Sequence, residues 1–142
     1  MIEAAFNAGR DRFGFRLIHY SVQANHLHLV VESESKESLA RGMKGLEVRL
    51  ARGLNRMMLR KGRVFAERYH GHVLKGPRET ARALRYVLMN FAHHAQAWGQ
   101  RVAATLIDPF SSVRYLATSP GPAAPVAGPR TWLLRVGWQS GS

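Results

Sequence analysis

The stretch of sequence that decides the fold is Asn25-His26-Leu27-His28-Leu29-Val30-Val31. Its β-branched and leucine residues follow a polar loop, a pattern typical of a β-strand. Successive side chains of a strand point to opposite faces, so His26, His28 and Val30 are predicted to share one face. The two imidazoles are then about 6–7 Å apart along the backbone, close enough to bind one divalent metal ion.

The segments around this strand predict an antiparallel sheet with long helices. Residues 15–22 form a second apolar stretch, joined to the histidine strand by a loop short enough for a hairpin. Periodic apolar residues, with Gly76-Pro77 opening the last helix, predict helices over residues 2–12, 38–59 and 76–98. Short extended pieces are expected at residues 63–65 and 69–74. Residues 118–142 are expected to form a Pro/Gly-rich mobile linker and an apolar tail, which docks on the body or on a partner.

Composition indicates one folded domain without a membrane span. The chain has 142 residues and is 46% apolar, which suffices for a single hydrophobic core. It has no apolar run of about 18–20 residues, and its N-terminus lacks the features of a signal peptide. The absence of cysteine excludes disulfides and thiolate metal sites. A cytoplasmic protein is therefore predicted.

The charge balance points to a polyanionic partner. There are 21 Lys and Arg residues against 9 Asp and Glu, a formal net charge of +12, which favours nucleic acid. Four arginines at intervals of three and four form a stripe on the predicted helix over residues 38–59: Arg49, Arg52, Arg56 and Arg60. Such a stripe is either a solvated face or a surface that contacts phosphates, and the net charge favours DNA binding.

A second motif lies on the helix predicted over residues 76–98. Tyr86 and Asn90 are four residues apart, so they lie one turn from each other on one face. Alone, Tyr86 is read as a packing residue and the histidine pair as structural. Together, two imidazoles and an amide oxygen from a facing helix would hold a metal ion with open positions beside the tyrosine. A phenol with a pKa of about 10 needs such activation, so this constellation suggests attack on a DNA phosphodiester.

The order and spacing of the two motifs resemble those of a known family. Asn25-His26-Leu27-His28-Leu29-Val30 followed by Leu84-Arg85-Tyr86-Val87-Leu88-Met89-Asn90 is similar to the single-tyrosine HUH transposases, in particular the REP-associated and IS200-like transposases. The stretch Arg63–His70 is also similar to a family segment. By the order of its elements the likeness covers residues 2–117, which are predicted to form the transposase-like domain.

The resemblance implies a fold, a chemistry and partners. The implied fold is a ferredoxin-like α+β domain, an antiparallel sheet with helices on one face. Because this chain opens with a helix, the family's first strand is expected to be missing, through an upstream start or a decayed copy. The implied metal ligands are His26, His28 and Asn90, which would hold Mg²⁺ or Mn²⁺. Tyr86 would attack single-stranded or hairpin DNA to form a 5′-phosphotyrosine, and the protein would act as a homodimer.

Two other functions remain open at this stage. The first is a catalytically inactive module of the same fold that binds nucleic acid through its basic surface. The second is a zinc hydrolase built on His26 and His28, although no general-base carboxylate stands at a useful spacing from them. His70 and His72 likewise have no carboxylate or amide at a useful spacing, so DNA contact or simple exposure is expected for them.

Overall fold

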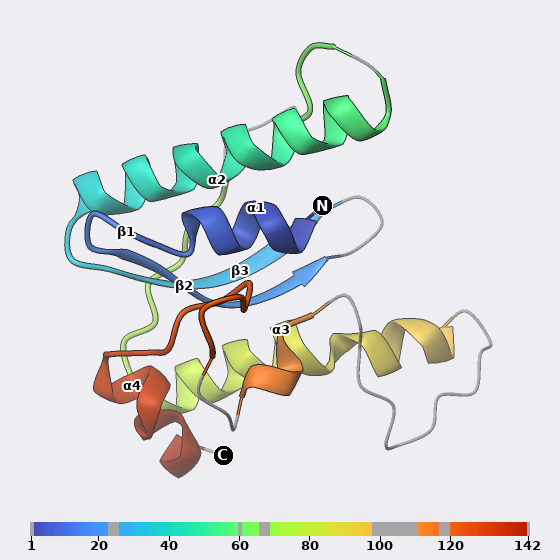
Figure 1. The fold of residues 1–142 in the computed structure, drawn as a ribbon. Helices are drawn as coiled ribbons and strands as arrows, with labels where there is room; N and C mark the ends of the chain where they lie inside the picture. Colours follow the sequence, from blue (N-terminus) through green and yellow to red (C-terminus); the bar gives the residue numbers. More distant parts are fainter. Residues whose placement is uncertain are drawn as a thin grey trace.

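A small antiparallel sheet lies between two layers of helices (Figure 1). The computed structural model describes residues 2–22, 26–59, 61–65, 69–97, 111–116 and 120–141, and of residues 90–97 it describes the backbone alone. The elements in chain order are α1 (Ile2–Gly9), β1 (Asp11–Arg12), β2 (Phe15–Val22), β3 (Leu27–Ser33), α2 (Lys36–Met57), α3 (Pro77–Ala97), η1 (Val113–Tyr115), α4 (Trp132–Arg135) and η2 (Gly137–Gly141). The predicted α+β class, the central hairpin and the three long helical segments are confirmed.

The strand order of the described sheet is β1-β2-β3, with antiparallel neighbours. Phe13 and Gly14 join β1 to β2, and both have positive φ angles, 56° and 80°. Two such residues in sequence make the kind of tight turn that matches the twist of a hairpin. Between β2 and β3 the register shifts at Ile18, a β-bulge that leaves Val22 paired with Leu27. As expected, the described sheet begins after the first helix.

Helices α1 and α2 cover the first face of the sheet. The apolar cluster on this face consists of Phe6, Phe15, Leu17, Tyr20, Met43, Leu46, Leu50 and Val126, against which Leu27, Leu29 and Val31 pack. Gly42 allows α2 to lie directly on Phe15, because a Cβ atom at this glycine would lie 2.0 Å from the ring's Cγ. The apolar stripe predicted for this helix is therefore its buried face.

Helix α3 covers the opposite face, together with α4 and η2 (Figure 1). The second apolar cluster joins Ile18 and Val30 of the hairpin to Leu84, Val87 and Leu88 of α3 and Leu134 of α4. The expectation of helices on one face of the sheet is therefore corrected: both faces are covered. The physical reason is that the two long strands carry apolar side chains on both faces, and each face needs a cover.

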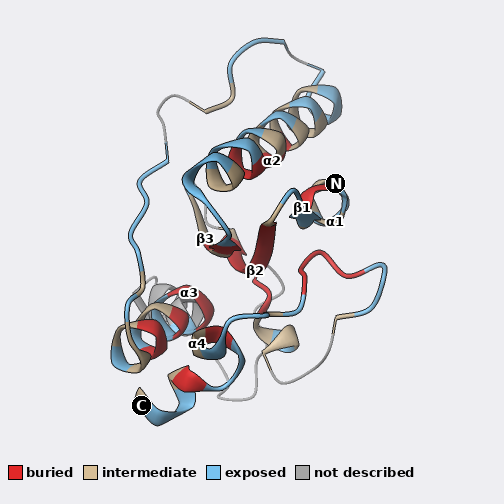
Figure 2. Ribbon diagram, turned by 90° about the vertical axis from the view of Figure 1, so that its left-hand side faces the viewer, coloured by how far each residue is buried: buried red, intermediate tan, exposed pale blue. Residues whose placement is uncertain are grey.

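The connection between α2 and α3 carries no strand in its described parts. Residues 63–65 and 69–74 were predicted to be short extended pieces, and within residues 61–65 and 69–75 the structure assigns neither helix nor strand. Figure 2 shows the described parts of this connection as mostly exposed. Extended chain forms a strand only where a pairing partner is present.

The segment after residue 119 packs on the body instead of forming a mobile linker. Arg10 donates hydrogen bonds to the carbonyl oxygens of Gly121, Pro122, Ala124 and Val126. The amide of Ala127 donates to the carbonyl of Leu17 in β2, at 2.8 Å. The segment contains a turn, in which the amide of Ala124 donates to the carbonyl of Gly121, and it is bound to α1 and to β2. The apolar tail docks back, on α3.

A buried carboxylate connects the sheet to the start of α4. Glu32, near the end of β3, pairs with Arg16 of β2 at 3.0 Å, and both side chains are buried. The same carboxylate accepts hydrogen bonds from the amides of Arg130 and Thr131 and from the Thr131 hydroxyl. Burial raises the pKa of Glu32, but these hydrogen bonds outweigh it and leave the pKa below its usual value. The carboxylate is thus ionised and fully engaged in holding the tail.

Val126 offers a direct test of this docking, because its side chain is fully buried in the first cluster. Val126→Ala removes two methyl groups and leaves a cavity, so we expect it to lower the free energy of unfolding by ~2–3 kcal/mol. Val136→Ala, a matched change in the same tail at an exposed position, is expected to cost less than ~0.5 kcal/mol. Equal effects in urea denaturation would contradict the packed arrangement.

Candidate active site

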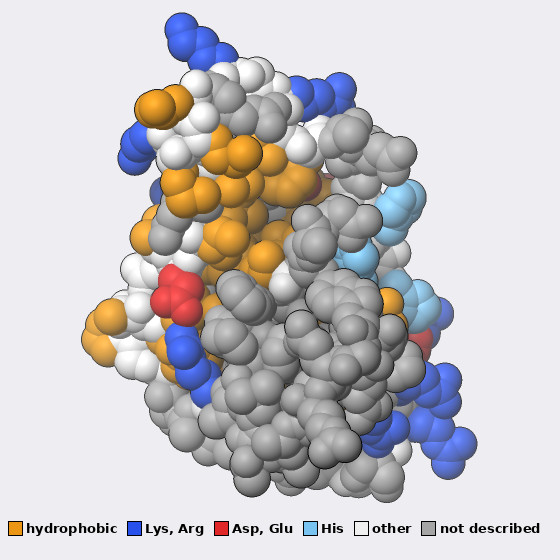
Figure 3. Space-filling view, turned by 90° about the vertical axis from the view of Figure 1, so that its right-hand side faces the viewer, with side chains coloured by type: hydrophobic (Ala, Val, Ile, Leu, Met, Phe, Trp, Pro, Cys, Tyr) orange, Lys and Arg blue, Asp and Glu red, His pale blue; other side chains and the backbone are white. Residues whose placement is uncertain are grey.

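The histidine pair lies at the start of β3, on the face that α3 covers. His26 is exposed and directly precedes the strand, and His28 is partly buried within it. Their ring centroids are 4.8 Å apart and the rings are edge to face. The predicted alternation is confirmed, because Leu27 and Leu29 point to the opposite cluster. Figure 3 shows histidine side chains along one side of the molecule, with lysine or arginine side chains beside them.

Tyr86 of α3 faces this pair. Its ring centroid is 5.1 Å from that of His28, again edge to face, while 53% of Tyr86 is exposed. Leu84, Val87 and Leu88 anchor α3 on the sheet, which leaves Tyr86 at the rim of the packed surface. The phenol is therefore next to the imidazoles and open to a ligand from solvent.

Asn90 is the third predicted metal ligand, and the structure describes only its backbone. It lies in α3 four residues after Tyr86, hence one helical turn further along. Its side chain is outside the described residues, so its role as a ligand stays a prediction. Among the residues whose side chains are described, no group of three or more His, Cys, Asp and Glu could hold a metal ion.

The arginine stripe of α2 lies on the other layer. Arg49, Arg52 and Arg56 line a groove between α2 and α1, with Ala4, Ala5 and Ala8 opposite them. Arg52 and Arg56 are exposed, and Arg60 lies outside the described residues. The three described arginines share a face, as the spacing predicted, but this face is separated from Tyr86 by the sheet.

Sequence reasoning missed His19, a buried histidine of β2. Its Nδ1 atom lies 3.0 Å from the Ser112 hydroxyl, and the Ser112 amide donates to the carbonyl of Tyr20. Burial lowers the pKa of His19 from 6.5 to about 4, so the imidazole is neutral at pH 7. Ser21, two residues after His19 in β2, pairs with His28 in the sheet. The contact of His19 with Ser112 therefore lies close to the histidine pair. No spacing in the sequence links residues so far apart.

His72 has a carboxylate partner that the sequence analysis did not assign. Its Nε2 atom contacts Glu79 Oε1, and the other oxygen of Glu79 accepts from the Lys75 amide at 3.1 Å. The Lys75 amide and the His72 ring together lower the pKa of Glu79. The pair closes the start of α3, so its position indicates a capping role. The signal available in the sequence was the position of Glu79 in the first turn of a predicted helix, seven residues after His72.

Comparison with known proteins identifies the family. The α+β sheet, the histidine–tyrosine contact and the basic α2 groove describe a domain suited to nucleic acid. The family model described as transposase IS200-like matches residues 1–90, more than half of the chain, and the chain belongs to this family. No curated protein and no solved structure was found to match the chain.

Family membership assigns the chain a role in DNA transposition, with DNA as its partner. The matched residues include both histidines, Tyr86 and Asn90, and they end at Asn90. No helix in the described part of the chain is both long and apolar enough to cross a membrane.

The buried His19 predicts a pH-dependent stability. The unfolded chain takes up a proton near pH 6.5 and the folded chain only near pH 4, so stability is full above pH 6.5 and is lost toward pH 4. This difference corresponds to about 3 kcal/mol. We expect His19→Asn to remove this contribution to the fall in the free energy of unfolding between pH 7 and pH 4, measured by urea denaturation. His70→Asn, a change at an exposed position, is the control and should keep the wild-type slope. A wild-type slope in His19→Asn would refute the assignment.

Proposed function

We propose that the protein is a metal-dependent single-tyrosine transposase that cleaves and rejoins single-stranded or hairpin DNA. The observation that carries the proposal is the contact of Tyr86 with the histidine pair, 5.1 Å between the ring centroids of Tyr86 and His28. Membership of the IS200-like family supports the DNA substrate. Action as a homodimer is a further part of the proposal. The net charge of +12 is consistent with a nucleic-acid partner.

In this mechanism Tyr86 supplies the nucleophile. Its oxygen attacks the phosphorus of the scissile phosphodiester and forms a bond to the 5′-phosphate. The bond from phosphorus to the 3′-oxygen breaks, this oxygen leaves as a 3′-hydroxyl, and the phenol proton passes to solvent at the exposed side of the ring. The phosphotyrosine keeps the energy of the broken bond, so rejoining to a 3′-hydroxyl needs no nucleotide cofactor.

The histidine pair would hold a divalent ion, Mg²⁺ or Mn²⁺, with Asn90 as the third ligand. The residues fit such an ion because the rings of His26 and His28 are 4.8 Å apart, while nitrogen–metal bonds are about 2 Å long. When bound, the ion would polarise the phosphate and stabilise the leaving oxygen. Arg49, Arg52 and Arg56 would neutralise backbone phosphates of a DNA segment on the other layer, with Arg60 as a further proposed contact.

The inactive binding module is the second candidate, and the position of the arginine groove favours it as an alternative. That groove would bind DNA on the α1–α2 layer whether or not Tyr86 reacts. The zinc hydrolase has less support, because the carboxylate of Glu32, which follows the histidines on β3, is engaged by Arg16 and Thr131.

The covalent intermediate provides the decisive experiment. Wild type incubated with Mn²⁺ and a hairpin-bearing single strand labelled at its 3′ end is expected to give a labelled adduct on denaturing gels. Tyr86→Phe should bind the strand equally and give none, because the attacking oxygen is absent. Tyr69→Phe is the matched control and should react like wild type. Binding by wild type without any adduct would favour the inactive module.

Metal binding gives a separate test. His26→Ala and His28→Ala are each expected to weaken Mn²⁺ binding about tenfold or more, followed by electron paramagnetic resonance, because each removes one nitrogen ligand. His72→Ala is the matched control and should bind like wild type. Undiminished Mn²⁺ binding in both site variants would remove the metal from the proposal.

A further inference from the structure

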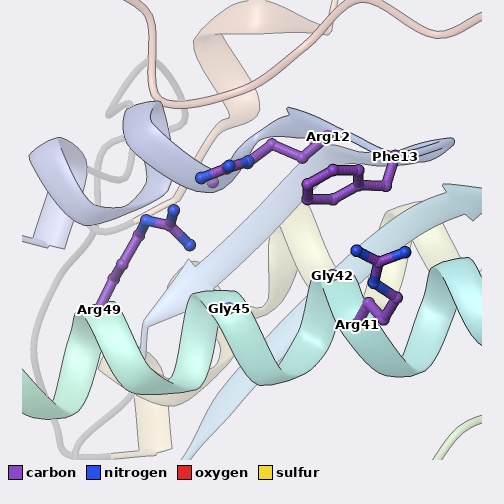
Figure 4. A pocket seen from close by; sticks show the side chains of 7 residues that line it. Arg12, Phe13, Arg41, Gly42, Gly45 and Arg49 are labelled. Atoms are coloured by element: carbon purple, nitrogen blue, oxygen red, sulfur yellow. The ribbon is translucent and has the colours of Figure 1, made fainter.

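A second basic pocket lies between the β1–β2 turn and helix α2, away from Tyr86 (Figure 4). It encloses about 180 Å³ and is lined by Gly9, Arg12, Phe13, Arg41, Gly42, Gly45 and Arg49. Three of these residues are arginines and three are glycines, so the pocket has cationic walls and side-chain-free backbone between them. No acidic residue lines it.

Phe13 organises the arginines of this pocket. It is 58% exposed and is held by the turn at a positive φ of 56°, a conformation that few side chains adopt without cause. The guanidinium of Arg41 lies 4.4 Å from its ring centroid and that of Arg12 lies 5.1 Å away, both within the range of cation–π attraction. The ring thus holds two cations in place before any ligand arrives.

Arg49 reaches the same pocket from the next turns of α2. Its Nη1 atom lies 2.8 Å from the position that a Cβ of Gly45 would occupy, so the guanidinium folds back over this glycine. In Figure 4 the guanidinium groups of Arg12 and Arg49 point toward one another. Like charges that face each other repel, and an anion between them would remove this repulsion. Within the described part of the chain, none of the three arginines forms an ion pair with a carboxylate.

We propose that this pocket binds a backbone phosphate of DNA, held by Arg12, Arg41 and Arg49. Guanidinium groups match the oxygens of a phosphate in geometry and charge. The proposal deepens the proposed function, because it names where the transposase holds DNA outside its candidate active site. Phe13 precedes β2 and the histidines follow its far end, so the two sites are about 25 Å apart along the strand. The phosphate bound here therefore belongs to a segment distant from the bond that is cleaved.

The test measures affinity for a fluorescent single strand without divalent metal, as a function of salt. The double variant Arg12→Gln with Arg41→Gln removes two arginines that line this pocket and not the groove of Arg52 and Arg56. It is expected to bind roughly three- to tenfold more weakly, and the slope of log K against log salt should fall by about 0.7, the value for one phosphate contact. Arg78→Gln with Arg135→Gln makes the same change of net charge at exposed positions on the other layer and should retain the wild-type slope. Equal losses in the two double variants would overturn the proposal.

Gly45→Ala tests the geometry without changing the charge. The new methyl group displaces the end of Arg49, and because alanine favours helix the fold is retained, which circular dichroism checks. A weaker affinity, by about two- to fivefold, is expected; wild-type affinity would refute the role of Arg49 in the pocket. Inorganic phosphate alone is titrated in a calorimeter for comparison. Binding of phosphate as tight as that of the oligonucleotide would overturn the choice of DNA as the ligand.

The measurement of DNA affinity as a function of salt is independent of cleavage. It contains no metal and needs no reaction at Tyr86, so absence of the covalent adduct would remove the proposed chemistry and leave the pocket in place. Conversely, formation of the adduct together with an unchanged salt dependence in the Arg12–Arg41 double variant would support the chemistry and contradict the pocket.

Discussion

The structure depends on a single strand, β3, whose side chains point alternately toward two different layers of helices. Leu27, Leu29 and Val31 pack toward α1 and α2, while His28 and Val30 face α3. A slip of one residue in the pairing with β2 would exchange these two sets, turning the imidazole toward α1 and α2 and the leucines toward α3. Because both faces are covered, the register is strongly specified. The position of the histidines beside Tyr86 is thus a consequence of core packing rather than of any interaction between the polar groups themselves.

Buried polar contacts then fasten the second layer, on which Tyr86 depends. Glu32 binds Arg16 and the backbone at the start of α4, and α4 and η2 pack against α3. At the end of η2, Gly141 lies so close to Pro77 that a Cβ there would be 2.3 Å from its carbonyl carbon. The helix that carries Tyr86 is therefore held between the sheet and the C-terminal segment. Since one partner removed from a buried ion pair leaves a charge unsatisfied, this attachment is sensitive to any change at Glu32 or Arg16.

Local periodicity predicted much of this arrangement, and its failures have identifiable causes. The strands and the long helices follow from spacings of two and of three to four residues. The meeting of Tyr86 with the histidine pair was expected from the combination of the two motifs and from the family resemblance. The second helical layer was missed because Ile18 and Val30 were read within their own strands and not as a second apolar face. Residues 120–129 looked like a linker because proline and glycine signal extended chain, while the partner that binds them, Arg10, lies more than a hundred residues away. Contacts such as His19 with Ser112 have no local signature at all.

The division into two layers also constrains how such a domain meets DNA. The described acidic groups are largely used internally: Glu32 and Glu34 by Arg16, Glu79 by His72, Glu3 by Arg114 and Asp11 by Arg130. The arginines that line the two pockets of the α1–α2 layer form none of these ion pairs, whereas the phenol of Tyr86 stands on the α3 layer. Cationic surface that attracts a phosphate backbone is thus physically separate from the groups that would cut it. A strand held on the first layer reaches Tyr86 only by passing round an edge of the sheet, and single-stranded DNA bends round such an edge far more easily than a stiff duplex. Under the proposed function, separation of this kind would make affinity a property of one layer and reactivity a property of the other.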